Sequence, residues 1–264
     1  MEGKFTQNGI YYETENFKKW RQTLIFIHGL SGSLSAWDSF KDLSDHYNLV
    51  FFDLRGHGKS VRYPSYDDYS LENFTEDLKI LLDDLKIKKF IIIAHSFGCL
   101  LALDFLGKYH NKVKAAVFLS PDYRIGKTMR GHFIRIMLGG AQFLKYLPFK
   151  SKTGKHIDYS IFPKGDWSLR RILADARNTT FRSYLFCLKQ ASKFAEEDIL
   201  PQIKIPVLII HGGKDTIFPA GDSIRMASKI KNARLKIIPE ANHLLVLNSA
   251  DQVKKEIKEF LLTV

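Results

Sequence analysis

Residues 90–101 of the chain read FIIIAHSFGCLL. The run Phe90–Ala94 is apolar and rich in β-branched side chains, which predicts a strand covered on both faces of a parallel sheet. An apolar helix is expected from about Cys99. Ser96 then occupies a sharp strand-to-helix turn, whose strained backbone exposes the hydroxyl group. Small residues two positions before and after the serine relieve crowding in such a turn, and here they are Ala94 and Gly98, in the pattern A-x-S-x-G.

Short apolar runs alternate with amphipathic segments on both sides of this turn. The alternation predicts the α/β class, with a mostly parallel central sheet and helices on both of its faces. Besides Phe90–Ala94, we expect buried strands at Leu24–Ile27, Leu49–Phe52, Val113–Leu119, Val207–Ile210 and Leu235–Ile238.

Helices are predicted from capping residues and from the spacing of apolar residues. Ser70 can cap a helix in which apolar side chains recur on one face. Further helices are expected over Ser223–Ile230 and Ala250–Leu262. Near the start of the chain, Lys4–Glu13 has the pattern of a short hairpin that turns at Asn8-Gly9.

The alternation stops between Pro121 and Ile205, where helical patches occur but no convincing strand. We expect residues 122–205 to form a helical cap inserted over the carboxyl edge of the sheet, and residues 1–121 and 206–264 to form the core. The large apolar side chains of the cap have two interpretations: they line an apolar pocket for an acyl chain, or they pack the cap onto the sheet. They are Phe133, Ile134, Ile136, Met137, Leu138, Phe143, Leu144, Tyr146, Leu147, Phe149, Phe162, Trp167, Phe181, Tyr184 and Phe186.

Positive charge is concentrated in the cap. The 264 residues include 40 Lys and Arg against 28 Asp and Glu, a net charge of +12, and residues 123–200 hold 15 of the basic and 6 of the acidic residues. Neither zinc-finger spacing nor an aromatic RNA-binding strand motif is present, so we expect no nucleic-acid partner. The basic cap is first interpreted as a plain solvated face. Apolar residues beside Arg130, Arg135, Lys145 and Lys150 are also what a peripheral contact with anionic lipid would show, and this is the other interpretation. The sequence does not indicate an oligomeric state.

The remaining features of composition concern the cell compartment. The N-terminal residues MEGKFTQN are polar, and no apolar run approaches the roughly 18 residues of a membrane span. The two cysteines are too few for a disulfide framework. These features predict a cytoplasmic protein.

The loops that follow the predicted strands are the candidates for a site, because ligands of open α/β sheets bind beyond the carboxyl ends of the strands. A serine hydroxyl needs a histidine as base, and the histidine needs a carboxylate to fix its tautomer. His243 follows the last predicted strand and Asp215 follows the one before it, in the chain order Ser, Asp, His. The stretch HGLSGS at residues 28–33 follows the first predicted strand of the core. The N–H groups of Leu30 and Phe97 are candidate donors to an oxyanion.

These stretches resemble the α/β-hydrolase fold superfamily over nearly the whole chain. The stretch Asp53–Ser60 (DLRGHGKS) is very typical of that superfamily and is structural there. The resemblance implies Ser96 as nucleophile, Asp215 as acid and His243 as base, with residues around 122–200 as the lid. Some relatives take the acid from the strand after the nucleophile helix, where this chain has Asp122. We favour Asp215, and this alternative stays open.

The triad and the resemblance together predict a serine hydrolase that cleaves carboxylic esters through an acyl-enzyme. The expected substrates carry a short-to-medium acyl chain or are similar to monoacylglycerols. No cofactor or metal is expected, since the sequence has no metal-ligand spacing. A serine at position 96 disfavours the haloalkane dehalogenase and epoxide hydrolase branches, which use aspartate there. A C–C bond hydrolase or lactonase with the same triad, a cofactor-free oxygenase of this fold and a non-catalytic ligand-binding protein remain as alternatives.

Overall fold

The structure is a computed structural model that describes residues 1–146 and 154–264, without the side chains of residues 142, 144 and 145. Of the residues assigned to the cap above, Leu147, Phe149 and Lys150 lie outside the described residues, as do the side chains of Leu144 and Lys145.

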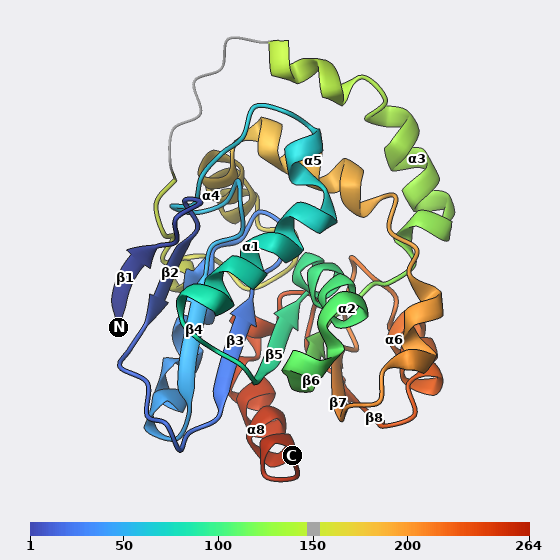
Figure 1. Cartoon of the computed structure of the whole chain (residues 1–264). Coiled ribbons are helices and arrows are strands. Elements are labelled where there is room, and N and C mark those ends of the chain that lie inside the picture. Colours follow the sequence, from blue (N-terminus) through green and yellow to red (C-terminus); the bar gives the residue numbers. More distant parts are fainter. Residues whose placement is uncertain (147–153) are drawn as a thin grey trace.

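Within these residues, one eight-stranded sheet forms the centre of the molecule, in the order β1-β2-β4-β3-β5-β6-β7-β8 (Figure 1). β1 and β2 form a hairpin, and β2 pairs antiparallel with β4. The other neighbouring strands pair parallel, which confirms the mostly parallel sheet expected from the sequence. The strands are β1 (Glu2–Phe5), β2 (Tyr11–Thr14), β3 (Thr23–Ile27), β4 (Asn48–Phe52), β5 (Phe90–His95), β6 (Val113–Leu119), β7 (Val207–Gly212) and β8 (Ala233–Ile238).

Helices connect the parallel strands and cover the sheet. The α-helices are α1 (Leu71–Asp84), α2 (Phe97–Tyr109), α3 (Met129–Met137), α4 (Leu169–Thr179), α5 (Phe181–Ala191), α6 (Ala220–Lys229), α7 (Leu245–Asn248) and α8 (Ala250–Leu261). The 3₁₀ segments are η1 (Leu34–Asp45), η2 (Asp67–Tyr69), η3 (His110–Lys112), η4 (Ile125–Lys127), η5 (Ala141–Tyr146), η6 (Tyr159–Ile161) and η7 (Glu197–Gln202). None of the helices in the described ranges combines the length and the apolar character that crossing a bilayer requires.

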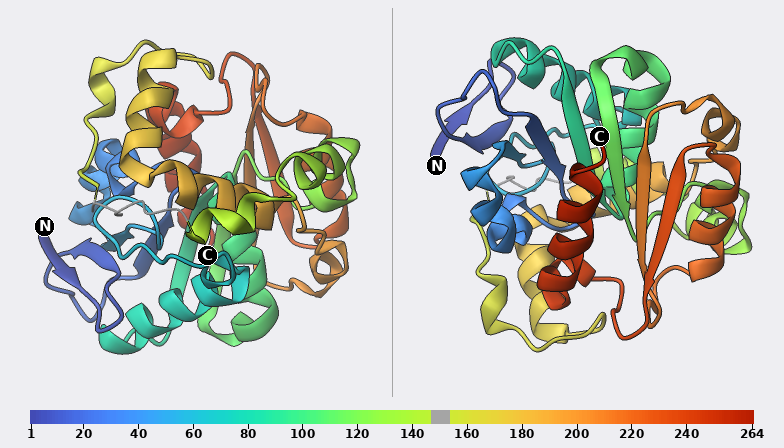
Figure 2. Two further views of the ribbon diagram at one scale, coloured as in Figure 1. Left: turned by 90° about the horizontal axis from the view of Figure 1, so that it is seen from above. Right: turned by 90° about the horizontal axis from the view of Figure 1, so that it is seen from below.

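Both faces of the sheet are covered, which explains the nearly continuous apolar runs of its central strands. Successive side chains of a strand point to opposite faces, so Ile25 and Ile27 join one core cluster while Leu24 and Phe26 join the other. Helices α1, α2 and α6 contribute to the first cluster, and η1 and α8 contribute to the second (Figures 1 and 2). Each central strand therefore packs against helices on two sides.

All the predicted strands occur. The last one, β8, was predicted to be buried on both faces, and this prediction was wrong. β8 lies at the edge of the sheet, where Arg234 and Lys236 are exposed and Ile238 alone in the strand is fully buried. Leu235–Ile238 is therefore not covered on both faces. Charged side chains on such an edge strand also discourage pairing with another chain.

The predicted helices and the hairpin are confirmed with small shifts of their ends. Ser70 caps α1, its hydroxyl accepting the N–H of Asn73 at 3.3 Å. Helix α6 begins at Ala220, earlier than predicted, because Pro219 forms its N-cap. In the hairpin, Gly9 has a φ of 81°, and a conformation of this kind favours glycine. The long 3₁₀ segment η1 was not predicted.

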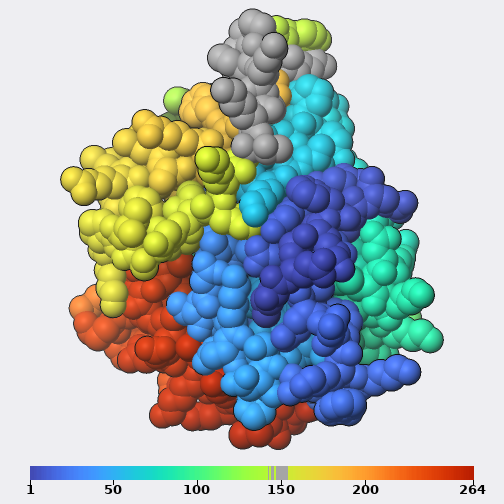
Figure 3. Space-filling view, turned by 90° about the vertical axis from the view of Figure 1, so that its left-hand side faces the viewer, coloured from blue at the N-terminus to red at the C-terminus, as the bar shows by residue number. Residues whose placement is uncertain are grey.

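The segment between β6 and β7 (residues 122–205, here called the cap segment) is helical and holds no strand among its described residues. It lies over the carboxyl ends of the strands, where Thr179 donates to the backbone oxygen of Ser31 at 3.1 Å (Figure 2). Figure 3 shows part of this segment, in yellow, resting on both the N-terminal and the C-terminal parts of the chain. That the cap segment is a domain apart from a core of residues 1–121 and 206–264 stays a prediction.

Gly98, in the first turn of α2, leaves no room for a side chain. A Cβ atom at this position would lie 2.7 Å from the backbone oxygens of Ile27 and His28, which cannot move without disturbing β3. We expect Gly98→Ala to lower the free energy of unfolding by roughly 1–3 kcal/mol, the usual range for overpacking. A thermal melt measures this as a lower Tm.

Gly221→Ala is the matched control for this substitution. Gly221 lies in the first turn of α6, and an added Cβ would meet nothing within 4 Å. Alanine there should leave the stability unchanged or raise it by up to about 1 kcal/mol. Equal melting temperatures for the Gly98→Ala variant and the parent protein would show that β3 and α2 are less tightly packed than described.

Candidate active site

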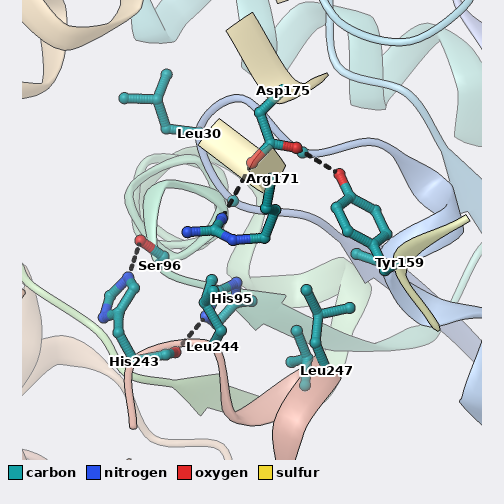
Figure 4. Close-up of a pocket in the computed structure, with 13 residues that line it drawn as sticks. Leu30, His95, Ser96, Tyr159, Arg171, Asp175, His243, Leu244 and Leu247 are labelled. Carbon is teal, nitrogen blue, oxygen red and sulfur yellow. Dashed lines mark hydrogen bonds and ion pairs between the residues drawn. The ribbon is translucent and has the colours of Figure 1, made fainter. Parts of the chain in front are cut away.

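Ser96 lies between β5 and α2 in a backbone conformation that few residues adopt. Its φ is 51° and its ψ is −117°, a region that residues with a side chain occupy only under strain. Its N–H donates to the backbone oxygen of Leu119 in β6 at 2.9 Å, and its own backbone oxygen accepts the N–H of Cys99 at 2.9 Å. The side chain points out of the turn toward His243 (Figure 4).

Ser96, His243 and Asp215 form a continuous chain of hydrogen bonds. Ser96 Oγ lies 2.9 Å from His243 Nε2, and His243 Nδ1 lies 2.8 Å from Asp215 Oδ2. The other carboxylate oxygen of Asp215 accepts the N–H groups of Ile217 and Phe218, each at 2.8 Å. The fold thus brings together three residues that follow three different strands.

The surroundings of Asp215 favour its ionised form. Burial by itself raises the pKa of this carboxyl group, but the hydrogen bond and charge of His243, together with the N–H of Phe218, outweigh burial, and the pKa of Asp215 is lowered. His211 Nε2 also lies 3.3 Å from Asp215 Oδ2. An ionised carboxylate holds the proton of His243 on Nδ1, which leaves Nε2 able to accept the proton of the Ser96 hydroxyl.

Asp122, the alternative acid, has different partners. Its Oδ1 accepts the N–H of Arg124 at 2.9 Å. Burial raises the pKa of Asp122, the reverse of the direction at Asp215. Because His243 Nδ1 is bonded to Asp215, the geometry favours Asp215 as the carboxylate that orients the histidine.

Leu30 and Phe97, the candidate oxyanion donors, both lie beside Ser96. Phe97 is the first residue of α2, so its N–H has no acceptor within the helix. Leu30 lines both of the cavities that contain Ser96. Gly29 brings the loop so close that a Cβ atom there would lie 3.2 Å from the Cβ of Ser96. The loop and the helix N-terminus therefore border the place where a negative oxygen would form.

A buried carboxylate orders this loop from the side of β4. Asp53 Oδ1 accepts the N–H of Leu34, and Asp53 Oδ2 accepts the N–H of Lys59, each at 2.8 Å. The N–H of Leu54 donates to His28 Nε2 at 3.0 Å. The DLRGHGKS stretch thus positions residues 28–34 through hydrogen bonds and contributes no side chain to the chain of contacts at Ser96.

Two small cavities, each of about 60 Å³, meet at Ser96. The first, here called the apolar cavity, is lined by Leu30, Ser96, Phe97, Leu100, Asp122, Ile125, Leu188, Ala191 and Phe218. The second, here called the polar cavity, contains the side chains of Tyr159, Arg171 and Asp175 from the cap segment (Figure 4). The serine hydroxyl therefore has surroundings of two different kinds.

Tyr159, Arg171 and Asp175 were not predicted as site residues. Arg171 and Asp175 are four positions apart on α4, a spacing visible in the sequence, but such pairs usually lie on a solvated helix face. Here burial raises the pKa of Asp175 to about 6, against the opposing charge of Arg171. Only the placement of α4 over the sheet reveals that the pair faces Ser96.

The first interpretation of the apolar cap residues named from the sequence does not hold for those the structure describes, because none of them lines either cavity. Other apolar side chains of the cap segment, those of Ile125, Leu188 and Ala191, line the apolar cavity instead. Phe186 packs the cap onto the core, against the rings of Tyr66 and Tyr69. Others are largely exposed to solvent. The exposed ones are Phe133, Ile136, Met137, Phe143, Tyr146, Trp167 and Phe181.

His95, next to the serine, supports the position of His243. Its Nε2 donates to the backbone oxygen of His243 at 2.9 Å (Figure 4). Burial, followed by the nearby charge of His243, lowers the pKa of His95 to about 3. The ring is therefore neutral at physiological pH, and this hydrogen bond places its one proton on Nε2.

We expect the imidazole of His95 to stay neutral between pH 5 and 8. The folded protein binds this proton only near pH 3, whereas an unfolded chain binds it below about pH 6.5, so the fold loses stability as the pH falls from about 6.5 toward 3. The ¹⁵N chemical shifts of the histidine rings report the protonation state directly. A His95 ring that titrates between pH 5 and 8 would contradict the described geometry.

Comparisons with known proteins agree with this fold. The family model described as alpha/beta hydrolase fold matches residues 22–250. "Probable lysophospholipase BODYGUARD 2" of Arabidopsis thaliana is 24% identical over 87% of this chain, which spans only 56% of that relative's length. "Putative non-heme chloroperoxidase" of Synechocystis is 26% identical over 96% of this chain and 94% of its own. A solved hydrolase from Pseudomonas aeruginosa PA01 is 20% identical over 98% of this chain and 97% of its own, with a TM-score of 0.78. The chain belongs to the alpha/beta hydrolase fold family.

Proposed function

We propose that the protein hydrolyses carboxylic esters through an acyl-enzyme, with Ser96 as nucleophile, His243 as general base and acid, and Asp215 as the carboxylate that orients the histidine. The observation that carries this proposal is the continuous chain of hydrogen bonds from Ser96 through His243 to Asp215, at 2.9 and 2.8 Å. An unassisted serine hydroxyl is a poor nucleophile, and this arrangement is what activates it.

The reaction follows from these positions. His243 Nε2 removes the proton of Ser96 as Oγ attacks the carbonyl carbon of the ester, and the carbonyl oxygen becomes negative beside the N–H groups of Leu30 and Phe97. The bond to the alcohol oxygen then breaks, and the proton on His243 passes to the leaving alcohol. Water attacks the acyl carbon next, giving its proton to His243, and the released serine oxygen takes that proton back.

The apolar cavity supports a short acyl group. Its volume of about 60 Å³ is well below the roughly 300–1,000 Å³ of pockets that hold drug-sized ligands. Leu100 and Leu188 close it, and both are held by helices. Of the substrates predicted from the sequence, esters of short acids fit this cavity better than esters of medium-length acids or monoacylglycerol-like lipids.

The other predicted activities share the fold and the triad, so only assays with different substrates distinguish them. A lactonase or C–C bond hydrolase would use the same serine, and a cofactor-free oxygenase would consume oxygen. A non-catalytic binding protein would turn over nothing. The cytoplasmic location predicted from the sequence also stays a prediction.

We expect Ser96→Ala to abolish hydrolysis of p-nitrophenyl esters, with the best parent substrates at acetate to butyrate. Asp215→Asn should lower kcat by roughly 10³–10⁴-fold, because the amide favours the wrong tautomer of His243. Asp122→Asn should cost far less, since Asp122 does not contact the histidine. Steady-state kinetics of the purified variants measures all three.

Two outcomes would contradict this assignment. Loss of activity in Asp122→Asn but not in Asp215→Asn would transfer the acid role to Asp122. If the parent protein turned over no ester, the ester hydrolase would be contradicted, and the lactonase, C–C hydrolase, oxygenase and binding alternatives would be favoured.

We also propose that the cap segment contacts anionic membrane surfaces. Met129, Phe133, Ile136 and Met137 are exposed along one face of α3, and the surrounding segment carries the excess of positive charge. The predicted basic contacts need revision, because Arg130 and Arg135 both donate to backbone oxygens of the protein. The apolar face of α3 is therefore expected to supply most of the contact.

We expect the protein to sediment with vesicles that contain phosphatidylglycerol more than with neutral phosphatidylcholine vesicles. Replacing Phe133 and Ile136 together by serine should weaken binding by roughly tenfold or more, because each large apolar side chain contributes about 1.5–3 kcal/mol when buried. Ile224→Ser, at an exposed position on α6, is the control. Equal binding by the two variants would show that α3 does not form the contact.

A further inference from the structure

The polar cavity beside Ser96 contains three polar side chains of the cap segment that the catalytic chain does not use, opposite a core lining that includes Leu244 and Leu247. Tyr159 comes from η6, and Arg171 and Asp175 come from successive turns of α4. Tyr159 donates to Asp175 Oδ1 at 3.0 Å, and Arg171 Nη1 donates to Asp175 Oδ2 at 3.0 Å. Figure 4 shows the guanidinium group directed from α4 toward the region of Ser96 and His95.

Hydrogen-bond donors and acceptors both remain available in this cluster. Each oxygen of Asp175 accepts one hydrogen bond, from Tyr159 or from Arg171, and can accept a second. Arg171 Nη2 donates to the backbone oxygen of Asp166 at 2.6 Å, and Nε is buried without a hydrogen-bond partner in the described part of the chain. The side chain of Arg171 is only 12% exposed, so solvent does not compensate for the missing partner. The terminal nitrogens Nη1 and Nη2 each carry two N–H groups and donate one of them to Asp175 or Asp166, so the second of each is left for a ligand with an acceptor oxygen.

The charges around the cavity favour a neutral ligand. Arg171 is paired with Asp175, so the cluster carries no net charge when the carboxyl is ionised. A third cavity, of about 220 Å³, adjoins the polar cavity and shares the side chains of Tyr159 and Arg171 with it. Its lining adds Asp38 and Asp158 against Lys164, and Asp38 is paired with Lys41 at 2.7 Å, so neither cavity has an excess of positive charge that would attract a carboxylate or phosphate.

We propose that Tyr159, Arg171 and Asp175 form the subsite for the alcohol portion of the substrate, and that this subsite selects neutral, oxygen-rich alcohols such as glycerol or a sugar. The proposal rests on the ester hydrolysis proposed above. The short acyl group occupies the apolar cavity, the ester carbonyl lies at Ser96, and the polyol accepts hydrogen bonds from Arg171. The adjoining cavity of about 220 Å³ gives the polyol room to extend toward the surface.

Three butyrate esters that differ only in the alcohol test this subsite. Glycerol monobutyrate carries a neutral polyol, butyl butyrate an apolar alcohol, and butyryloxyacetate an anionic one. At pH 8, we expect kcat/KM of the parent protein to be at least tenfold higher for glycerol monobutyrate than for each of the others. Equal values, or a preference for butyl butyrate or butyryloxyacetate, would overturn the subsite.

Variants at Arg171 connect this preference to the cluster. Arg171→Met should reduce the preference for glycerol monobutyrate over butyl butyrate by roughly 10- to 100-fold, mainly through KM, because hydrogen bonds to a charged donor are lost. Arg170→Met is the control, since Arg170 is exposed on the same helix and lines neither cavity. An unchanged preference in a folded Arg171→Met protein would contradict the proposal.

A second variant keeps the test valid if Arg171→Met does not fold. Arg171→Lys retains a positive charge near Asp175 but lacks the planar fork of Nη1 and Nη2 donors, so the preference should still fall. Retained preference in Arg171→Lys would overturn the role of these donors.

The outcomes also separate the two proposals. Hydrolysis of p-nitrophenyl butyrate that depends on Ser96, together with no preference among the three alcohols, contradicts the subsite and leaves the ester hydrolase intact. No hydrolysis of any butyrate ester contradicts both.

Discussion

The close packing of the first turn of α2 against the end of β3 is the contact on which the site depends. A Cβ atom at Gly98 would lie 2.7 Å from the backbone oxygens of Ile27 and His28, so the two elements approach too closely for a side chain at this position. This approach places the loop of residues 28–33 directly beside Ser96. The strained conformation of Ser96 persists because β5 and α2, which flank it, are both buried in the core.

Two buried carboxylates order the loops around this contact in the same way. Asp53 accepts backbone N–H groups from residues 34 and 59, and Asp215 accepts those of residues 217 and 218. In both cases favourable hydrogen bonds and neighbouring histidines outweigh burial and lower the pKa of the carboxyl group. A charge that is satisfied in this way can be buried, and each one fixes a loop that would otherwise have few contacts.

The chemistry and the selectivity of the site come from different parts of the chain. The triad and the oxyanion loop follow strands of the sheet, whereas the cap segment supplies Tyr159, Arg171 and Asp175. The same segment exposes the apolar face of α3 to solvent. In the proposed reaction the sheet holds the reacting groups and the cap segment contacts the substrate, an arrangement that lets selectivity vary with the cap while Ser96 stays in place.

The sequence by itself determined those features that depend on neighbours along the chain. The alternation of apolar runs and helices, the turn at Ser96 and the order of Asp215 and His243 are all local patterns, and each led to a strand, a turn or a loop in its predicted place. Which strand lies at the edge of the sheet is not local, so β8 was predicted to be buried although its charged residues face solvent. Which apolar cap residues line the site was not predictable for the same reason, since hydrophobicity does not say which way a helix faces. Only the tertiary structure decided that His243 bonds to Asp215 and not to Asp122, and that Arg171 and Asp175 face Ser96. These contacts join segments far apart in the chain, and their geometry depends on how the whole sheet and the cap segment pack together.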